Sequence, residues 1–149
     1  MMPDIIRQNI IEKIQQNILA INNSTGEYFF NYPNKVFINK QTPFASIGIN
    51  IRTVENNLST NSESSLTLWN AELTIEIDIV CTNAAELSNL YKYEADILKC
   101  IGNNLTLDNL VINIIYQSTV YNNIDQLGNK IGDATIRLQI LYRQKAWGL

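Results

Sequence analysis

The chain of 149 residues contains no histidine, the side chain that most often acts as a general acid or base near neutral pH. Only two cysteines, Cys81 and Cys100, are present, so the usual histidine and cysteine ligands of a zinc site are lacking. The six glycines are scattered and form no glycine-rich phosphate loop. We therefore expect no catalytic residues, no metal site and no cofactor, and we predict that the protein is not an enzyme.

Charge is also sparse, since 17% of the residues are charged and the formal net charge is −3. Affinity for nucleic acid rests mainly on Lys and Arg side chains that neutralise phosphates, so we do not expect tight DNA binding. No apolar run approaches the ~20 residues of a membrane-spanning helix, and the N-terminal residues show no secretory signal. The sequence therefore predicts a protein with no membrane contact.

What is present is typical of one folded domain, residues 1–149. The length suits a single domain, the 46% hydrophobic fraction is ordinary, and neither a repeat nor a linker divides the chain. We expect both cysteines to be buried thiols of a reducing compartment. A disulfide and a reactive thiol are the alternatives.

The predicted strand at residues 66–81 has the most regular pattern, because apolar and polar residues alternate from Leu73 onward. Successive side chains of a strand point to opposite faces, so one face of this strand is expected to lie against a core. The core-facing residues are Leu73, Ile75, Ile77, Ile79 and Cys81. The opposite face carries Glu72, Thr74, Glu76 and Asp78.

The other elements follow from the same reasoning. Isoleucines at steps of three and four predict an amphipathic helix over residues 3–22. A second helix over residues 83–101 has an expected apolar face of Leu87, Leu90, Tyr91, Ile97, Leu98 and Ile101, with Tyr93 at its boundary. Alternation predicts strands at residues 35–39 (short), 44–54, 110–121 and 134–142, the third with Ile112, Ile114 and Tyr116 on one face.

These elements predict an α+β fold, in which a mostly antiparallel sheet of four to five strands has two helices packed on one face. The second face of the sheet is then polar. Cross-strand pairs on it, such as Glu76 with Arg52 or Arg137, are expected to contribute only some tenths of a kcal/mol each.

The order of elements resembles one protein family. An amphipathic helix precedes a β-hairpin, residues 44–81, with a polar loop. The strand ending in Cys81-Thr82-Asn83 leads directly into a capped helix, and a final hairpin closes on ATIRLQILYR, residues 134–143. In these features, which cover nearly the whole chain, the sequence resembles the tail terminator proteins of long-tailed bacteriophages, small α+β proteins of similar length.

The resemblance implies structural work in the virion without catalysis. Tail terminators form a hexameric ring on the last ring of the tail tube, end its polymerisation and offer a docking surface to the head–tail connector. In contractile tails they also contact the sheath protein. The implied partners are therefore other copies of this chain, the tail tube protein, the connector protein and the sheath protein. DNA would only pass through the lumen, and assembly would take place in the host bacterial cytoplasm.

A ring joins different patches of adjacent subunits. The candidate interface is the polar sheet face, comprising Arg52, Glu72, Glu76, Asp78 and Arg137. A solvated or salt-bridged surface of a monomer explains the same residues. The candidate assembly loop covers residues 55–65 and includes Glu55, Asn56, Asn57, Asn61 and Glu63.

Two other functions remain open. One is a head–tail completion or neck protein of similar fold. The other is a small ligand-binding or enzymatic α+β domain, which would need a concave pocket with convergent polar groups. The absence of histidine and of any paired nucleophile and base counts against an enzyme.

Overall fold

The computed structural model describes residues 3–25, 36–38, 47–59, 68–81, 90–123 and 132–145. Two helices and five strands occur within these ranges. In chain order they are α1 (Pro3–Thr25), β1 (Val36–Ile38), β2 (Ile47–Ser59), β3 (Leu68–Cys81), α2 (Leu90–Gly102), β4 (Asn113–Asn123) and β5 (Gly132–Lys145). The predicted α+β class and the mostly antiparallel sheet are confirmed.

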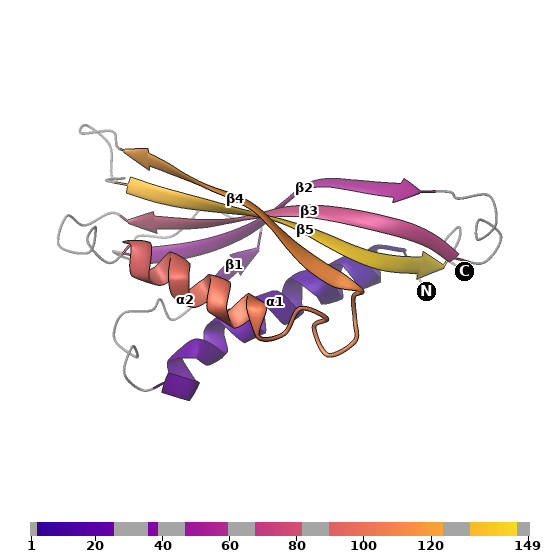
Figure 1. Cartoon of the computed structure of the whole chain (residues 1–149), viewed down its shortest axis with the longest axis horizontal. Coiled ribbons are helices and arrows are strands. Elements are labelled where there is room, and N and C mark those ends of the chain that lie inside the picture. Colours follow the sequence, from indigo (N-terminus) through magenta and orange to yellow (C-terminus); the bar gives the residue numbers. More distant parts are fainter. Residues whose placement is uncertain are drawn as a thin grey trace.

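The five strands form one sheet in the order β1-β2-β3-β5-β4 (Figure 1). The last strand, β5, lies between β3 and β4, and three of the four pairings are antiparallel. The exception is β1, which runs parallel to β2 and pairs only with Ile49–Ile51. Within the described part of the chain, β4 is therefore one edge of the sheet, and β1 covers only a short part of β2.

The core lies between the sheet and the two helices, which Figure 1 shows on the same side of the sheet. The alternating residues Leu73, Ile75, Ile77 and Ile79 of β3 are fully buried, as predicted. Residues of the flanking strands and of the α1 stripe also belong to the core, including Ile49, Ile51, Ile136, Leu138, Ile140, Ile10, Ile14 and Ile18. Burial of this size of apolar surface is the main favourable contribution to folding.

The prediction for α2 was wrong about its tyrosines. Tyr93 is fully buried, whereas Tyr91 is 66% exposed. The buried stripe runs through Leu90, Tyr93, Ile97 and Ile101, at steps of three and four residues. Tyr91 lies next to Leu90 in sequence and so about 100° away around the helix, off this stripe. The proposed helix cap at residues 83–89 is outside the described residues.

Two strands also differ from prediction. β2 continues to Ser59, so Glu55, Asn56 and Asn57 belong to a strand paired with β3 and not to a loop. A register shift between Thr53 and Glu55, of the kind that a β-bulge produces, accommodates this extension. Their polar side chains do not prevent pairing, because the backbone forms the ladder. The other two residues of the predicted loop, Asn61 and Glu63, are outside the described residues.

In β4 only part of the predicted inward face is buried. Ile114 is buried, but Ile112 precedes the strand and Tyr116 is 50% exposed. A second register shift lies between Tyr116 and Ser118. Since β4 is at the sheet edge, the helices do not cover the whole of its inward face.

The turn between α2 and β4 holds three consecutive non-glycine residues in the left-handed region, with φ values of 49° at Leu107, 59° at Asp108 and 71° at Asn109. The Asp108 backbone N–H donates to Asn104 Oδ1 at 3.0 Å, and Lys13 Nζ of α1 lies 2.6 Å from Asp108 Oδ2. The ion pair with Lys13 lowers the pKa of Asp108. The turn is thus held by its own side chains and by α1.

Replacing Asn109 with alanine is expected to lower the free energy of unfolding by about 1 kcal/mol, because asparagine tolerates the left-handed conformation and alanine does not. Asn109→Gly should change it by less than about 0.5 kcal/mol. Urea unfolding of both variants checks this, with Asn103→Ala in the same turn as the control. Equal effects of the three substitutions would contradict the backbone explanation.

Candidate functional site

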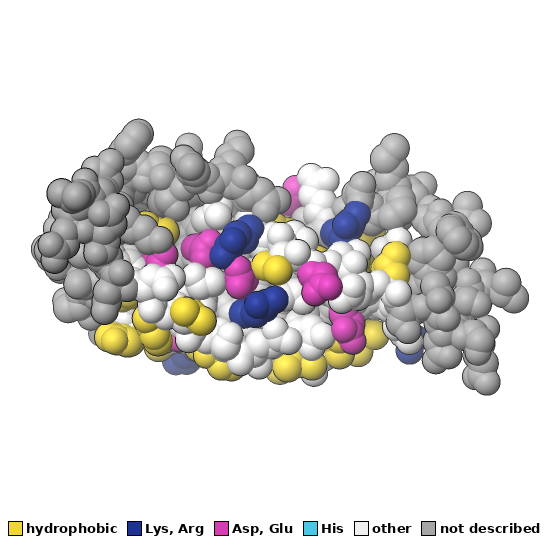
Figure 2. Space-filling view, turned by 90° about the horizontal axis from the view of Figure 1, so that it is seen from above, with side chains coloured by type: hydrophobic (Ala, Val, Ile, Leu, Met, Phe, Trp, Pro, Cys, Tyr) yellow, Lys and Arg dark blue, Asp and Glu magenta, His cyan; other side chains and the backbone are white. Residues whose placement is uncertain are grey.

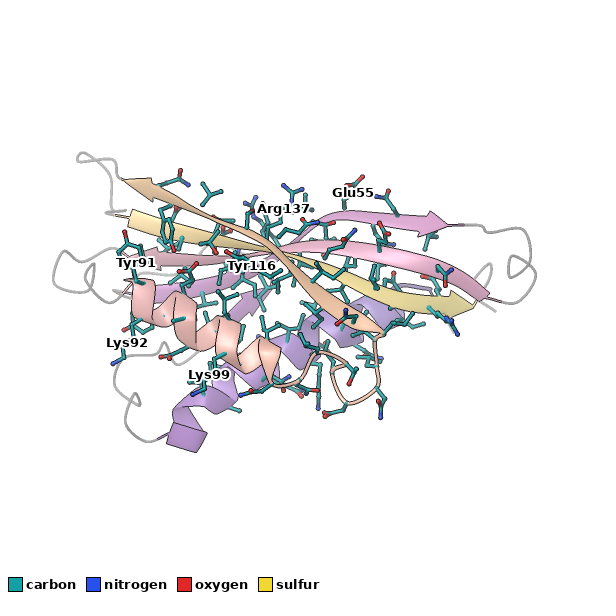
Figure 3. The ribbon with its side chains drawn as sticks, in the orientation of Figure 1. Glu55, Tyr91, Lys92, Lys99, Tyr116 and Arg137 are labelled. Carbon is teal, nitrogen blue, oxygen red and sulfur yellow. The ribbon has the colours of Figure 1, made fainter. Side chains whose placement is uncertain are left out.

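The predicted interface residues lie on the outer face of the sheet, the face turned away from the helices (Figure 3 labels Arg137). Arg52 of β2, Glu76 of β3 and Arg137 of β5 are direct cross-strand neighbours in one row. Glu76 forms an ion pair with Arg52 and lies 3.9 Å from Arg137 Nη1 through Oε2. The predicted pairing of Glu76 with Arg52 and Arg137 is confirmed.

Asp78 extends the same cluster. Its Oδ2 is 3.1 Å from Arg52 Nε, and its Oδ1 accepts a hydrogen bond of 2.7 Å from Thr135. The Glu76 and Asp78 side chains are only 16% and 17% exposed, whereas Arg52 is 47% exposed. The carboxylates therefore lie close to the sheet surface, and the arginine side chains partly cover them. We call these four residues the outer-face ion cluster: Arg52, Glu76, Asp78 and Arg137.

Glu72, the fifth predicted interface residue, lies on the same face but apart from this cluster. Its Oε2 accepts a hydrogen bond of 3.0 Å from Gln139 Nε2, and its side chain is exposed. Figure 2 shows acidic and basic side chains interspersed over the middle of this face. The charges of the ion cluster are thus neutralised within the chain itself, and such a surface requires no partner.

The described residues of the predicted assembly loop point to both faces of β2. Glu55 projects from the outer face, where Figure 3 labels it, and Asn57 is exposed. Asn56 is on the opposite face, where its Oδ1 accepts a hydrogen bond of 2.9 Å from the buried Tyr142 hydroxyl. Burial raises the pKa of Tyr142. Asn56 therefore has a role in packing, and Glu55 and Asn57 are available to a partner.

Among the described residues, exposed large hydrophobic side chains concentrate along β4, a surface that the alternation pattern did not predict. Large hydrophobic side chains that are 36–54% exposed occur throughout residues 110–121. Figure 2 shows hydrophobic side chains gathered along one long side of the molecule. We define the β4 edge patch as Ile112, Ile115, Tyr116, Val120 and Tyr121. Exposed large hydrophobic side chains gathered along one strand are typical of an interaction site.

The sequence of β4 lacks the charged and proline residues that often protect an edge strand. Proteins commonly protect such strands with lysine, proline or inward-pointing charges, which hinder pairing with another chain. Residues 109–124 contain none of Asp, Glu, Lys, Arg or Pro. This uncharged run was the signal in the sequence that could have identified the surface, because it has apolar residues at both strand parities, including Ile114 and Ile115.

Two contacts with α2 hold the end of β4. The Tyr121 hydroxyl donates to the Glu94 carboxylate, and the Tyr121 and Tyr91 ring centroids are 5.1 Å apart. The bond to Glu94, together with partial burial, raises the pKa of Tyr121 to about 12. These contacts keep Tyr121 in a defined position although much of its ring is exposed.

Tyr121→Phe is expected to reduce the dependence of stability on alkaline pH. Since the Tyr121 pKa is higher in the folded chain, this contact stabilises fully below the unfolded value of about 10 and is lost as pH rises through about 12. The variant should be slightly less stable than wild type at neutral pH and should lose less stability over that alkaline window. Urea unfolding across the window measures this.

Tyr116→Phe is the matched control, because the Tyr116 hydroxyl contacts the Thr119 hydroxyl at 2.7 Å and both lie on β4. The same alkaline profile in both variants would show that the Glu94 contact does not contribute.

Other chemistry is limited in the described residues. No group of three or more potential acidic, cysteine or histidine ligands there could hold a metal ion, and no described helix is long and apolar enough to cross a membrane. Cys100 is a free thiol, 3.2 Å from the Asn17 carbonyl oxygen, and burial raises its pKa. Cys100 was expected to be buried and is only partly buried. The Cys81 side chain is outside the described residues.

Comparison of the chain with protein-family models gives no match, and comparison with curated proteins gives none either. The fold defines the class: an α+β protein with a mostly antiparallel sheet. The function is therefore argued from the surfaces of the molecule.

Proposed function

We propose that this protein is a structural subunit of a bacteriophage virion. It assembles with copies of itself into a ring that caps the tail tube, ends tail polymerisation and provides the docking surface for the head connector. The observation that carries the proposal is the β4 edge patch, an apolar and uncharged strand edge that suits burial in an assembly.

The element order supports a tail terminator in particular. The opening helix, the long β2–β3 hairpin and the closing strand β5 occur in the order on which the resemblance to that family rests. The partners implied are further copies of the chain, the tail tube protein, the connector protein and, in a contractile tail, the sheath protein. The site of action is then the neck region of the virion.

The first test is the mass of the purified protein in solution. Light scattering over a concentration series, with negative-stain images of the largest species, should detect rings of six subunits, or rings that appear as the concentration rises. Large irregular aggregates without a closed ring would count against a terminator, because a cap needs a closed assembly with defined symmetry.

The second test is tube capping. Tail tube protein is polymerised with and without the purified chain, and tube lengths and ends are scored by electron microscopy. A terminator shortens the tubes and adds a ring at one end. Unchanged tube lengths, with binding to the connector alone, would favour a head–tail completion or neck protein instead.

A further inference from the structure

We infer that adjacent subunits of the proposed ring join by strand addition, in which β4 of one subunit pairs with the segment Val54–Ser59 of β2 of the next. This inference rests on the proposed ring function and specifies the surface that builds the ring. The occupant of the β4 edge is thus a second copy of this chain, bound through a different edge of the same sheet.

The β4 edge offers what strand addition requires. Its 11 residues span about 36 Å at the usual rise per residue, and the side of β4 opposite β5 has no partner strand in the described part of the chain. Main-chain groups along such an edge give affinity to an added strand, and alternate side chains give specificity. Ile115 and Val120 on one face of β4, and Tyr116 and Tyr121 on the other, would flank the incoming strand.

This segment of β2 is a suitable partner. β1 covers β2 only at Ile49–Ile51, and no described strand lies on that side of Val54–Ser59. Val54 and Leu58 in this segment are 43% and 39% exposed, beyond the coverage of β1. The segment therefore combines exposed apolar side chains with a backbone edge that no described strand covers.

Charge also permits this pairing. The segment Val54–Ser59 carries a single charged residue, Glu55. Because β4 has no charged residue, no like charges would be opposed across the junction. The polar outer faces of both subunits would continue into one another.

The strand directions fit a ring. Successive antiparallel pairings from β2 through β3 and β5 to β4 make β2 and β4 run in opposite directions. In a ring whose subunits all point the same way along the axis, β4 of one subunit therefore meets β2 of the next in antiparallel orientation. This is the geometry of three of the four pairings within the subunit. Two different edges also make a heterologous contact, which closes rings of more than two subunits.

The experiment uses two edge-blocked variants of the full chain. Ile115→Lys with Val120→Lys places charges on the β4 edge, and Val54→Lys with Leu58→Lys places them on the β2 edge; all four residues are exposed, so both variants should fold. Each variant alone should self-associate about 100-fold more weakly than wild type, because charge on an edge strand hinders pairing. Analytical ultracentrifugation measures the association.

Mixing the two variants gives the decisive result. Each keeps one intact edge, so the mixture should form 1:1 dimers that grow no further. If β4 paired with β4 instead, the β2-edge variant would still dimerise alone, and this would overturn the inference. Leu105→Lys is the control, because Leu105 is similarly exposed but lies in the turn before β4. It should associate as wild type does, and thermal unfolding confirms that every variant is folded.

Failure of the inference and failure of the proposed function give different results. If both edge-blocked variants still form the rings that the wild-type chain forms, strand addition is wrong and the proposed ring function is unaffected. Strand-paired dimers from the mixture, together with no effect of wild type on tube length, would support the interface and overturn the terminator function. A wild-type chain that stays monomeric at its highest soluble concentration would overturn the inference.

Discussion

Tyr93→Ala is expected to lower the free energy of unfolding by about 3–5 kcal/mol, as large aromatic truncations in cores do. Tyr93 is fully buried on the stripe of α2 that faces the sheet, with Leu90, Ile97 and Ile101. Removing its ring leaves a cavity at the contact between α2 and the sheet. Since a domain of this size is typically stable by only about 5–15 kcal/mol, the variant should show a large fall in its urea midpoint.

The matched control is Tyr91→Ala. Tyr91 is the same residue type on the same helix, but it is 66% exposed and its described ring contact is with Tyr121 at 5.1 Å. We expect a loss of about 1 kcal/mol or less. Circular dichroism during urea unfolding measures both variants. A larger loss for Tyr91→Ala than for Tyr93→Ala would mean that α2 is rotated about its axis from the position described.

The tyrosine pair shows where the sequence was informative and where it was not. The alternation in β3 and the isoleucine stripe of α1 were predictable, because each pattern is regular over many residues and one face is fully covered. In α2 the apolar residues fit two overlapping stripes, and tyrosine suits either a core or a boundary position. Packing of α2 against β3 and β5 determines which of the two stripes is buried, and the sequence alone does not show this packing.

The exposure of side chains at the edges of the sheet was harder to predict from the sequence. A register shift moves later residues to the opposite face, and both β2 and β4 contain one. Whether Tyr116 or Val120 is buried also depends on which strands and helices lie beside β4. The chain topology determines these neighbours, and the local sequence pattern does not reveal them. The pairing of Glu76 with Arg52 and Arg137 was predictable as chemistry. Their common row depends on β5 lying beside β3, which only the structure shows.

Glu76→Lys is the second substitution with a large expected effect, a loss of about 2 kcal/mol in the free energy of unfolding. It would place an ammonium group between the guanidinium groups of Arg52 and Arg137, directly opposite both in the strand register. Like charges opposite one another are destabilising, and at a position only 16% exposed water screens them weakly. Added salt should recover part of the loss, because it screens the partly exposed arginines.

Glu72→Lys is the control on the same strand and face, since Glu72 is exposed and its described contact is a hydrogen bond from Gln139. We expect a change of about 0.5 kcal/mol or less. If Glu72→Lys and Glu76→Lys lowered the free energy of unfolding equally, the ion pairs of Glu76 would make no specific contribution to stability.

Glu72→Lys, compared with the β4-edge variant, also separates the two candidate interfaces, the outer face of the sheet and the β4 edge. Glu72→Lys reverses a charge on the outer face without disturbing the ion cluster, so loss of assembly in this folded variant would place that face in a subunit contact. Normal assembly of Glu72→Lys, together with loss of assembly in the β4-edge variant, would assign ring formation to the β4 edge. The outer-face ion cluster would then stabilise the sheet of each subunit, and its charges would be neutralised before any partner binds.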